Sequence, residues 1–160
     1  TRAKTENEIY ELKIELAEQG YLKLNKIKGK VPKEQPPLKF VSTDGNIIFV
    51  GRNNKQNDKL TTKLAKKTDI WLHTQGINGA HVIIVSELNK PISNKTIEEA
   101  AIIAAYHSKA KNSSQVPVDY VEIKYVKKPN GSKPGMVIFK NNTTAYVNPD
   151  NDLVERLRAK

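Results

Sequence analysis

The chain has 160 residues, no cysteine, and a formal net charge of +10, with a pI of about 9.7. This length fits one domain, and the missing cysteines exclude disulfides and thiolate metal sites. The charge favours polyanionic partners such as RNA, DNA or an anionic surface. No apolar run approaches the roughly 20 residues that span a bilayer, and no signal-peptide pattern is present, so we expect no membrane insertion. Because the chain begins at Thr1 without a methionine, we expect a piece of a longer protein.

Residues 5–20 are predicted to form an amphipathic helix. Ile9, Leu12 and Leu16 recur at helical spacing and make a narrow apolar stripe. The segment is acidic, unlike the rest of the chain. Two interpretations stay open: a helix that packs on its own domain, or the end of a longer coiled-coil arm.

Three prolines, at positions 32, 36 and 37, mark the domain boundary. Proline fixes φ and removes an amide donor, so residues 32–37 are predicted to be a linker. Residues 1–31 then hold the helical arm and the start of a basic linker. Residues 38–150 form an α/β domain, and residues 151–160 form a charged tail with some helical character.

The domain is predicted to begin with a β-hairpin and a basic helix. Two apolar runs between Leu38 and Gly51 flank an Asp-Gly turn, which is a strong hairpin signal. Asn53 or Asn54 then caps a helix that continues to about Lys67. Leu60 and Leu64 are expected to face the core.

The basic helix is the main candidate site. Its lysines recur at three- and four-residue spacing and share one face, with six basic residues against one acid in 52–67. Like charges at this spacing are destabilising unless a partner neutralises them, so we predict anion binding; a merely solvated face is the alternative. The predicted nucleic-acid-binding residues here are Arg52, Lys55, Lys59, Lys63, Lys66 and Lys67.

Two strands are predicted to follow the helix. Residues 69–74 alternate apolar and polar side chains, which places Trp71 and His73 on one face. Residues 81–85 form a β-branched run typical of a strand buried on both faces. Trp71 is the candidate for stacking on unpaired bases, with His73 shaping the adjoining surface. An aromatic that fills the sheet face is an equal alternative for Trp71.

The second half of the domain predicts one helix and three strands. The helix covers about 96–111, with a Thr96–Glu99 capping box, and a strand covers 118–126. Strands at 136–140 and 144–147 are expected to pair as a hairpin. The fold class is therefore α/β (α+β), with a single mixed β-sheet packed with helices and preceded by the N-terminal amphipathic helix.

A Pro/Gly-rich loop at residues 128–135 is the second basic region. It lacks the GxxxxGK[ST] pattern of a nucleotide-triphosphate loop. A basic turn can still contact a phosphate backbone through lysines and free amides, so Lys128 and Lys133 are also predicted to bind nucleic acid.

Catalysis has little support in the sequence. Asp69, His73 and His81 could be drawn as a triad with a serine or threonine, but no nucleophile elbow or oxyanion loop accompanies them. Three histidines without an HExxH pattern or cysteines do not make a zinc motif. We expect no enzymatic activity, no metal and no cofactor.

Four sequence blocks carry a resemblance to a known family. In chain order they read GRNNKQND, DIWLH, GAHVII and VDYVEIKYVKKPNGSKPG. Over about Leu38–Pro149 the chain resembles the NFACT-R domain, the C-terminal module of the RqcH/fibronectin-binding-protein-A-like family. The acidic helix before Pro32 then resembles the end of that family's coiled-coil middle region.

The resemblance implies an RNA- and ribosome-binding module of a bacterial ribosome quality-control factor in the cytoplasm. Such proteins bind the large ribosomal subunit and its rRNA, recruit tRNA, and add alanine tails to stalled nascent chains. The family's N-terminal domains are missing from the chain, so we expect no tailing by this piece alone. Several bacterial relatives are described as fibronectin-binding surface proteins, so an adhesin domain that binds host fibronectin at the cell surface is the alternative. The oligomeric state is left open.

Overall fold

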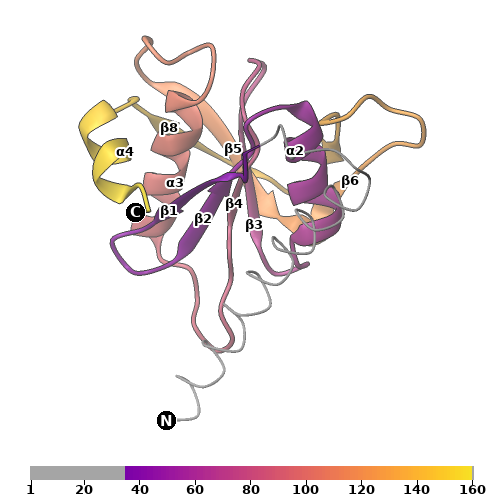
Figure 1. Ribbon diagram of the computed structural model, residues 1–160, viewed down its shortest axis with the longest axis horizontal. Coiled ribbons are helices and arrows are strands. Elements are labelled where there is room, and N and C mark those ends of the chain that lie inside the picture. The colour runs from indigo at the N-terminus through magenta and orange to yellow at the C-terminus, as the bar shows by residue number, and fades with distance from the viewer. Residues whose placement is uncertain (1–34, 160) are drawn as a thin grey trace.

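The computed structural model describes residues 35–159, so the predicted N-terminal helix lies outside the described residues. Six strands form one sheet in the order β1-β2-β4-β3-β5-β8, with helices on both faces (Figure 1). The α+β class is confirmed. The sheet is not mixed, however, because each of its five strand pairings is antiparallel.

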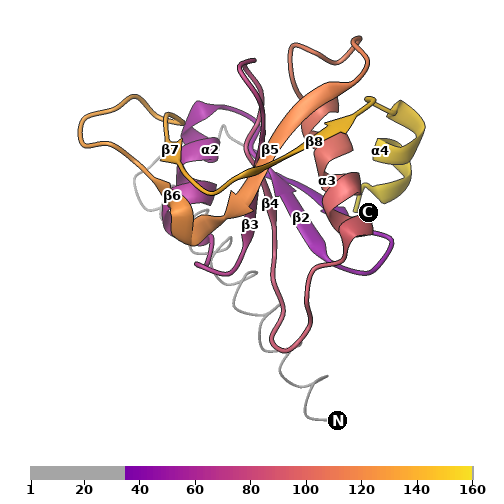
Figure 2. The same cartoon turned by 180° about the vertical axis from the view of Figure 1, so that it is seen from behind.

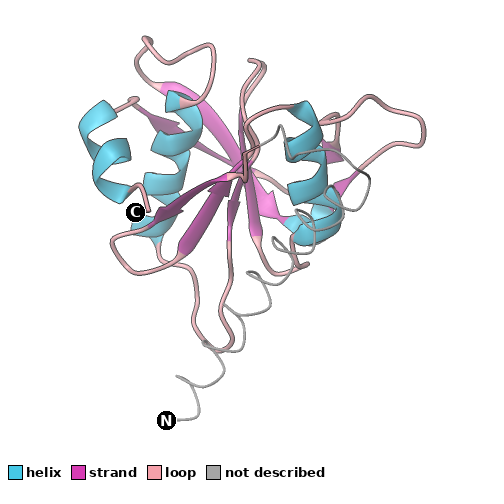
Figure 3. Cartoon of the chain, in the orientation of Figure 1, coloured by secondary structure: helices cyan, strands magenta, loops and turns pink. Residues whose placement is uncertain are grey.

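The elements are short and alternate along the chain (Figure 3). The strands of the large sheet are β1 (Leu38–Val41), β2 (Ile47–Val50), β3 (Ile70–Thr74), β4 (Val82–Ile84), β5 (Val116–Glu122) and β8 (Thr143–Val147). A separate two-stranded ribbon consists of β6 (Val126–Lys127) and β7 (Ile138–Phe139). The helices are α2 (Asn54–Lys59), the π-turn η1 (Leu60–Leu64), α3 (Asn94–Tyr106), the 3-10 turn η2 (Ile123–Tyr125) and α4 (Asn151–Leu157).

Strand alternation divides the core into two clusters, one on each face of the sheet. In β2, Ile48 and Val50 pack toward the cluster of α3 and α4, whereas Phe49 packs toward the other cluster with Leu60 of η1. Figures 1 and 2 show the same division: α3 and α4 cover one face, and α2 with the β6–β7 ribbon covers the other. The candidate basic residues therefore lie on the face opposite α3.

The first half of the domain forms largely as predicted. The β1–β2 hairpin is present, and Gly45 in its turn has a φ of +91°, a conformation that glycine adopts without strain. Asn53 caps α2 by accepting a hydrogen bond from the Gln56 amide. Leu64 is 40% exposed instead of facing the core. The reason is the π-turn, which adds a residue to the last helical turn and rotates Leu64 outward.

Two local predictions in the second half are wrong. The cap of α3 is Ser93, not Thr96; the Thr96 hydroxyl instead donates to Ser42 in the β1–β2 turn. The strands β7 and β8 do not form a hairpin with each other. β7 pairs with β6 and β8 pairs with β5, because β7 crosses to the α2 side of the sheet while β8 extends its edge.

The segment after residue 150 packs onto the domain. α4 buries Val154 and Leu157 against the α3 side of the sheet. Beyond it, the Ala159 amide donates to the Lys39 carbonyl at 2.9 Å, which covers the outer edge of β1. Among the described residues, no helix is long and apolar enough to cross a bilayer.

Candidate nucleic-acid interface

Uncharged residues of the GRNNKQND block hold α2 against the sheet. The buried Asn57 accepts a hydrogen bond from the His81 amide at 3.1 Å, which ties α2 to the start of β4. Gln56 accepts from the Arg52 amide at 2.8 Å and so closes the turn before the helix. A methyl group at Gly51 would collide with the Asn57 side chain, so only glycine fits there. These contacts fix the orientation of the helix and of the lysines on its outer side.

The basic side chains of residues 52–67 lie outside this network. Lys55, Lys63 and Lys67 are exposed, whereas Lys59 and Lys66 are half-buried. Lys66 donates from Nζ to the Ser86 carbonyl at 3.1 Å. Arg52 donates from Nε to the Pro36 carbonyl at 2.7 Å, although its side chain is exposed. The structure thus keeps three of the six predicted cations fully available on the surface of α2 and the segment after it.

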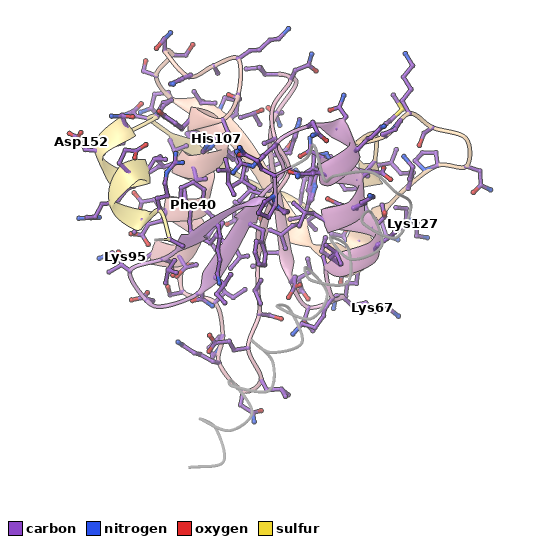
Figure 4. The ribbon with its side chains drawn as sticks, in the orientation of Figure 1. Phe40, Lys67, Lys95, His107, Lys127 and Asp152 are labelled. Atoms are coloured by element: carbon purple, nitrogen blue, oxygen red, sulfur yellow. The ribbon has the colours of Figure 1, made fainter. Side chains whose placement is uncertain are left out.

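The loop between β6 and β7 docks on α2 and joins the two predicted basic regions. Lys128 Nζ lies 2.7 Å from the Asp58 carboxylate, which also accepts a hydrogen bond from the Gly135 amide at 3.0 Å. Burial works to raise the pKa of Asp58, but the hydrogen bonds from Lys128 and Gly135 outweigh it and hold the pKa below its usual value. Lys128 is therefore neutralised within the protein, whereas Lys133 is exposed. In Figure 4, Lys67 and Lys127 lie on the same side of the molecule, away from Lys95 and Asp152.

Removing the charge of Asp58 is expected to strengthen binding of a polyanion. In Asp58→Asn the side-chain oxygen can still accept from the Gly135 amide, so the loop stays docked while Lys128 loses its counter-charge. We expect RNA affinity to rise about threefold at low salt, because one more cation becomes available to phosphates. Fluorescence anisotropy with labelled RNA measures this change, and unchanged or weaker binding would contradict it.

Trp71 is 1% exposed and belongs to the core cluster between the sheet and α2. Its indole N–H donates to His81 Nδ1 at 3.1 Å, and its ring lies 4.8 Å from that of Phe139 on β7. The ring therefore offers no free face to a base. Its position matches the alternative that the sequence left open, an aromatic that fills the face of the sheet.

His81 and His73 line the same interior. His81 Nδ1 accepts from Trp71 and also lies 2.7 Å from the Thr61 hydroxyl. Burial, followed by the neighbouring His73, lowers the pKa of His81 to about 4. Burial also lowers the pKa of His73, against smaller opposing effects from the Thr74 and Gly79 backbone. Both rings are neutral at neutral pH and act as packing and hydrogen-bonding groups.

Asp69 does not form a catalytic triad with His73 and His81. That carboxylate accepts hydrogen bonds from the amide and hydroxyl of Ser86, at 2.8 and 3.0 Å, and from the Lys66 amide at 2.8 Å. It therefore joins the end of η1 to the loop after β4. Within residues 35–159, no three histidine, aspartate or glutamate side chains gather as a metal-binding group.

Sequence reasoning missed the exposed apolar residues at the end of the basic loop. Met136 and Ile138 are 55% and 58% exposed, and Phe139 is 36% exposed. The signal was the run MVIFK next to the lysine-rich loop, whose pattern predicts only a strand.

The sequence of this domain matches a family described as NFACT protein RNA binding domain, over residues 37–141. The chain belongs to this NFACT RNA-binding family. It is 50% identical over 154 residues to the Rqc2 homolog RqcH of Bacillus subtilis, covering 94% of this chain and 26% of that relative. It is 44% identical over 152 residues to the Rqc2 homolog RqcH of Streptococcus suis, covering 94% of this chain and 27% of that relative. The chain thus spans about a quarter of the length of these NFACT relatives.

A solved structure shares the fold of this NFACT domain. It is described as the C-terminal of the fibronectin/fibrinogen-binding protein from Streptococcus suis. The TM-score is 0.76 at 43% identity, and the match covers 95% of this chain and 60% of that one. The family assignment and the placement of the lysines together indicate RNA as the polyanion.

Proposed function

We propose that this domain is the RNA- and ribosome-binding module of a bacterial ribosome quality-control factor. The observation that carries the proposal is the single basic surface made when the β6–β7 loop docks on α2 through Asp58. Membership of an RNA-binding family and the likeness to RqcH proteins support it. The cytoplasm is the compartment that this role requires.

The partners we propose are tRNA and the rRNA of the large ribosomal subunit. Both present dense phosphates, and the exposed Lys67 after η1 and Lys127 on β6 lie on one side of the domain (Figure 4), where they can contact phosphates. Addition of alanine to stalled chains belongs, in this proposal, to the full-length protein. This domain would act by binding and orienting, without catalytic turnover of its own; a turnover that is lost in His73→Ala would contradict that part.

Charge reversal on α2 and η1 tests the function directly. In Lys55→Glu/Lys63→Glu, two exposed cations become anions without disturbing the buried Asn57 contact. We expect affinity for tRNA to fall about tenfold or more, and the slope of log affinity against log salt to become shallower by about two. Anisotropy across a salt series measures both quantities.

The matched control reverses two exposed lysines on the opposite side. Lys95 lies on α3 and Lys109 lies just after it, and both are exposed. Lys95→Glu/Lys109→Glu makes the same change in net charge. Any loss of tRNA affinity in this variant therefore measures the long-range electrostatic effect of net charge alone. Equal losses in the two double variants would refute the assignment of the α2 surface.

Fibronectin binding is a second candidate, favoured by the description of the Streptococcus suis structure. It predicts saturable binding of purified fibronectin that persists at high salt and is unaffected by charge reversal at Lys55 and Lys63. A flat binding curve would remove this candidate.

A further inference from the structure

An exposed apolar strip lies within the basic β6–β7 region. Seven large hydrophobic side chains of the described residues are exposed, and three of them, Met136, Ile138 and Phe139, fall within four consecutive positions. Isolated exposed apolar side chains are ordinary, but a contiguous group marks a contact surface. The strip therefore calls for a partner that covers it.

The strip has two faces with different roles. Val137 and Phe139 pack inward. Val137 contacts the core cluster between the sheet and α2, and the ring centroid of Phe139 lies 4.8 Å from that of Trp71. Met136 and Ile138 alternate with them and are more than half exposed, as expected for the outer face of an extended segment. The inner contacts hold the ribbon in place, so the outer face is presented in a defined geometry.

Lysines surround the outer face. Lys127 is the strand partner of Ile138, and the exposed Lys140 follows two residues later. The segment 123–140 holds five lysines and no acid; Lys128 is paired with Asp58 and Lys124 with Glu122, whereas Lys127 and Lys140 are exposed. A partner that fits must present apolar surface and negative charge at close spacing.

We propose that the outer face of the β6–β7 ribbon binds unpaired bases of single-stranded RNA, with Met136 and Ile138 against the bases and Lys127 and Lys140 at the flanking phosphates. The inference rests on the proposed function and extends it to a class of RNA. A duplex hides its base faces in the stack, whereas unpaired bases expose them. Proteins usually hold a single strand by stacking its bases on aromatic side chains beside a positively charged backbone track. Here Met136 and Ile138 supply an aliphatic surface for the base faces instead.

The test compares a labelled single-stranded oligouridylate with an RNA duplex of equal length, using the whole 160-residue chain. In Met136→Ser/Ile138→Ser we expect oligouridylate affinity to fall about three- to tenfold, with a salt slope unchanged, because no charge is removed. Duplex affinity should change by less than about twofold. In Ile138→Tyr, which adds a ring at an exposed position, oligouridylate affinity should rise.

Leu88→Ser is the control, since Leu88 is 65% exposed and belongs to the loop between β4 and α3, which Figure 2 shows away from β6 and β7. It should bind both probes as the unmodified chain does. Equal losses of affinity for single strand and duplex in the serine variant would overturn the single-strand inference. Unchanged affinity for both probes in that variant would also overturn it and would point to a protein partner for the strip. The proposed function fails separately, if the unmodified chain binds neither probe.

Discussion

Replacing Trp71 by alanine is expected to lower the free energy of unfolding by about 3–5 kcal/mol, the range for truncating a buried large aromatic. The side chain is 1% exposed, contacts Phe139 and donates its indole N–H to His81. Domains of this size are stable by roughly 5–15 kcal/mol, so this loss is a large fraction of the total. Urea unfolding followed by circular dichroism measures it. A loss below about 1 kcal/mol would contradict the buried position.

Trp71→Phe separates packing from direct RNA contact. Phenylalanine keeps most of the ring volume but cannot donate to His81, so the expected loss is about 1–3 kcal/mol. At a temperature where Trp71→Phe is folded, we expect it to bind single-stranded RNA nearly as the unmodified chain does, because the buried Trp71 ring offers no free face to a base. A specific loss of single-strand affinity in folded Trp71→Phe would instead favour the interpretation that Trp71 stacks on unpaired bases.

Local patterns predicted the parts of the fold that are specified by neighbouring residues. The Asp44-Gly45 turn, the Asn53 cap and the buried run at β4 each follow from chemistry within a few positions. The predictions failed where contact with a segment distant in the sequence determines the local structure. Ser93 displaces Thr96 as the cap of α3 because Thr96 is engaged by the β1–β2 turn, some 54 residues away in sequence.

The candidate site shows the same division. Spacing alone identified the lysines of α2 and η1, and the structure leaves Lys55 and Lys63 exposed. Spacing could not show that Lys128 is neutralised by Asp58, since the two are brought together by the docking of a loop. Spacing also left open whether Trp71 stacks on bases or fills the face of the sheet; in the structure the ribbon covers that ring and exposes Ile138. Coverage of one element by another is a tertiary property that no local pattern records.

Acid is expected to destabilise the domain between about pH 6.5 and 4 through His81. The pKa of this buried ring is lowered from its ordinary value of 6.5 to about 4, so in that window the unfolded chain binds a proton that the folded chain excludes. The stabilisation is complete above pH 6.5 and is lost as the pH falls toward 4. At 1.36 kcal/mol per pKa unit, the loss from His81 is about 3 kcal/mol. Urea unfolding at a series of pH values measures it.

Hydrogen-bond geometry supports this direction independently of the pKa. His81 Nδ1 accepts a hydrogen bond from the Trp71 N–H. A proton on Nδ1 would make that atom a donor, so the two N–H groups would face each other with no acceptor between them. The charged or titratable groups that face the ring are His73, Asp58 and Lys128, and only Asp58 favours the protonated form. His81→Asn is the control, because its amide oxygen can accept from Trp71 but does not titrate. The pH dependence of unfolding should be shallower by about 3 kcal/mol over the window in this variant. Parallel curves for the two proteins would show that the acid sensitivity arises elsewhere.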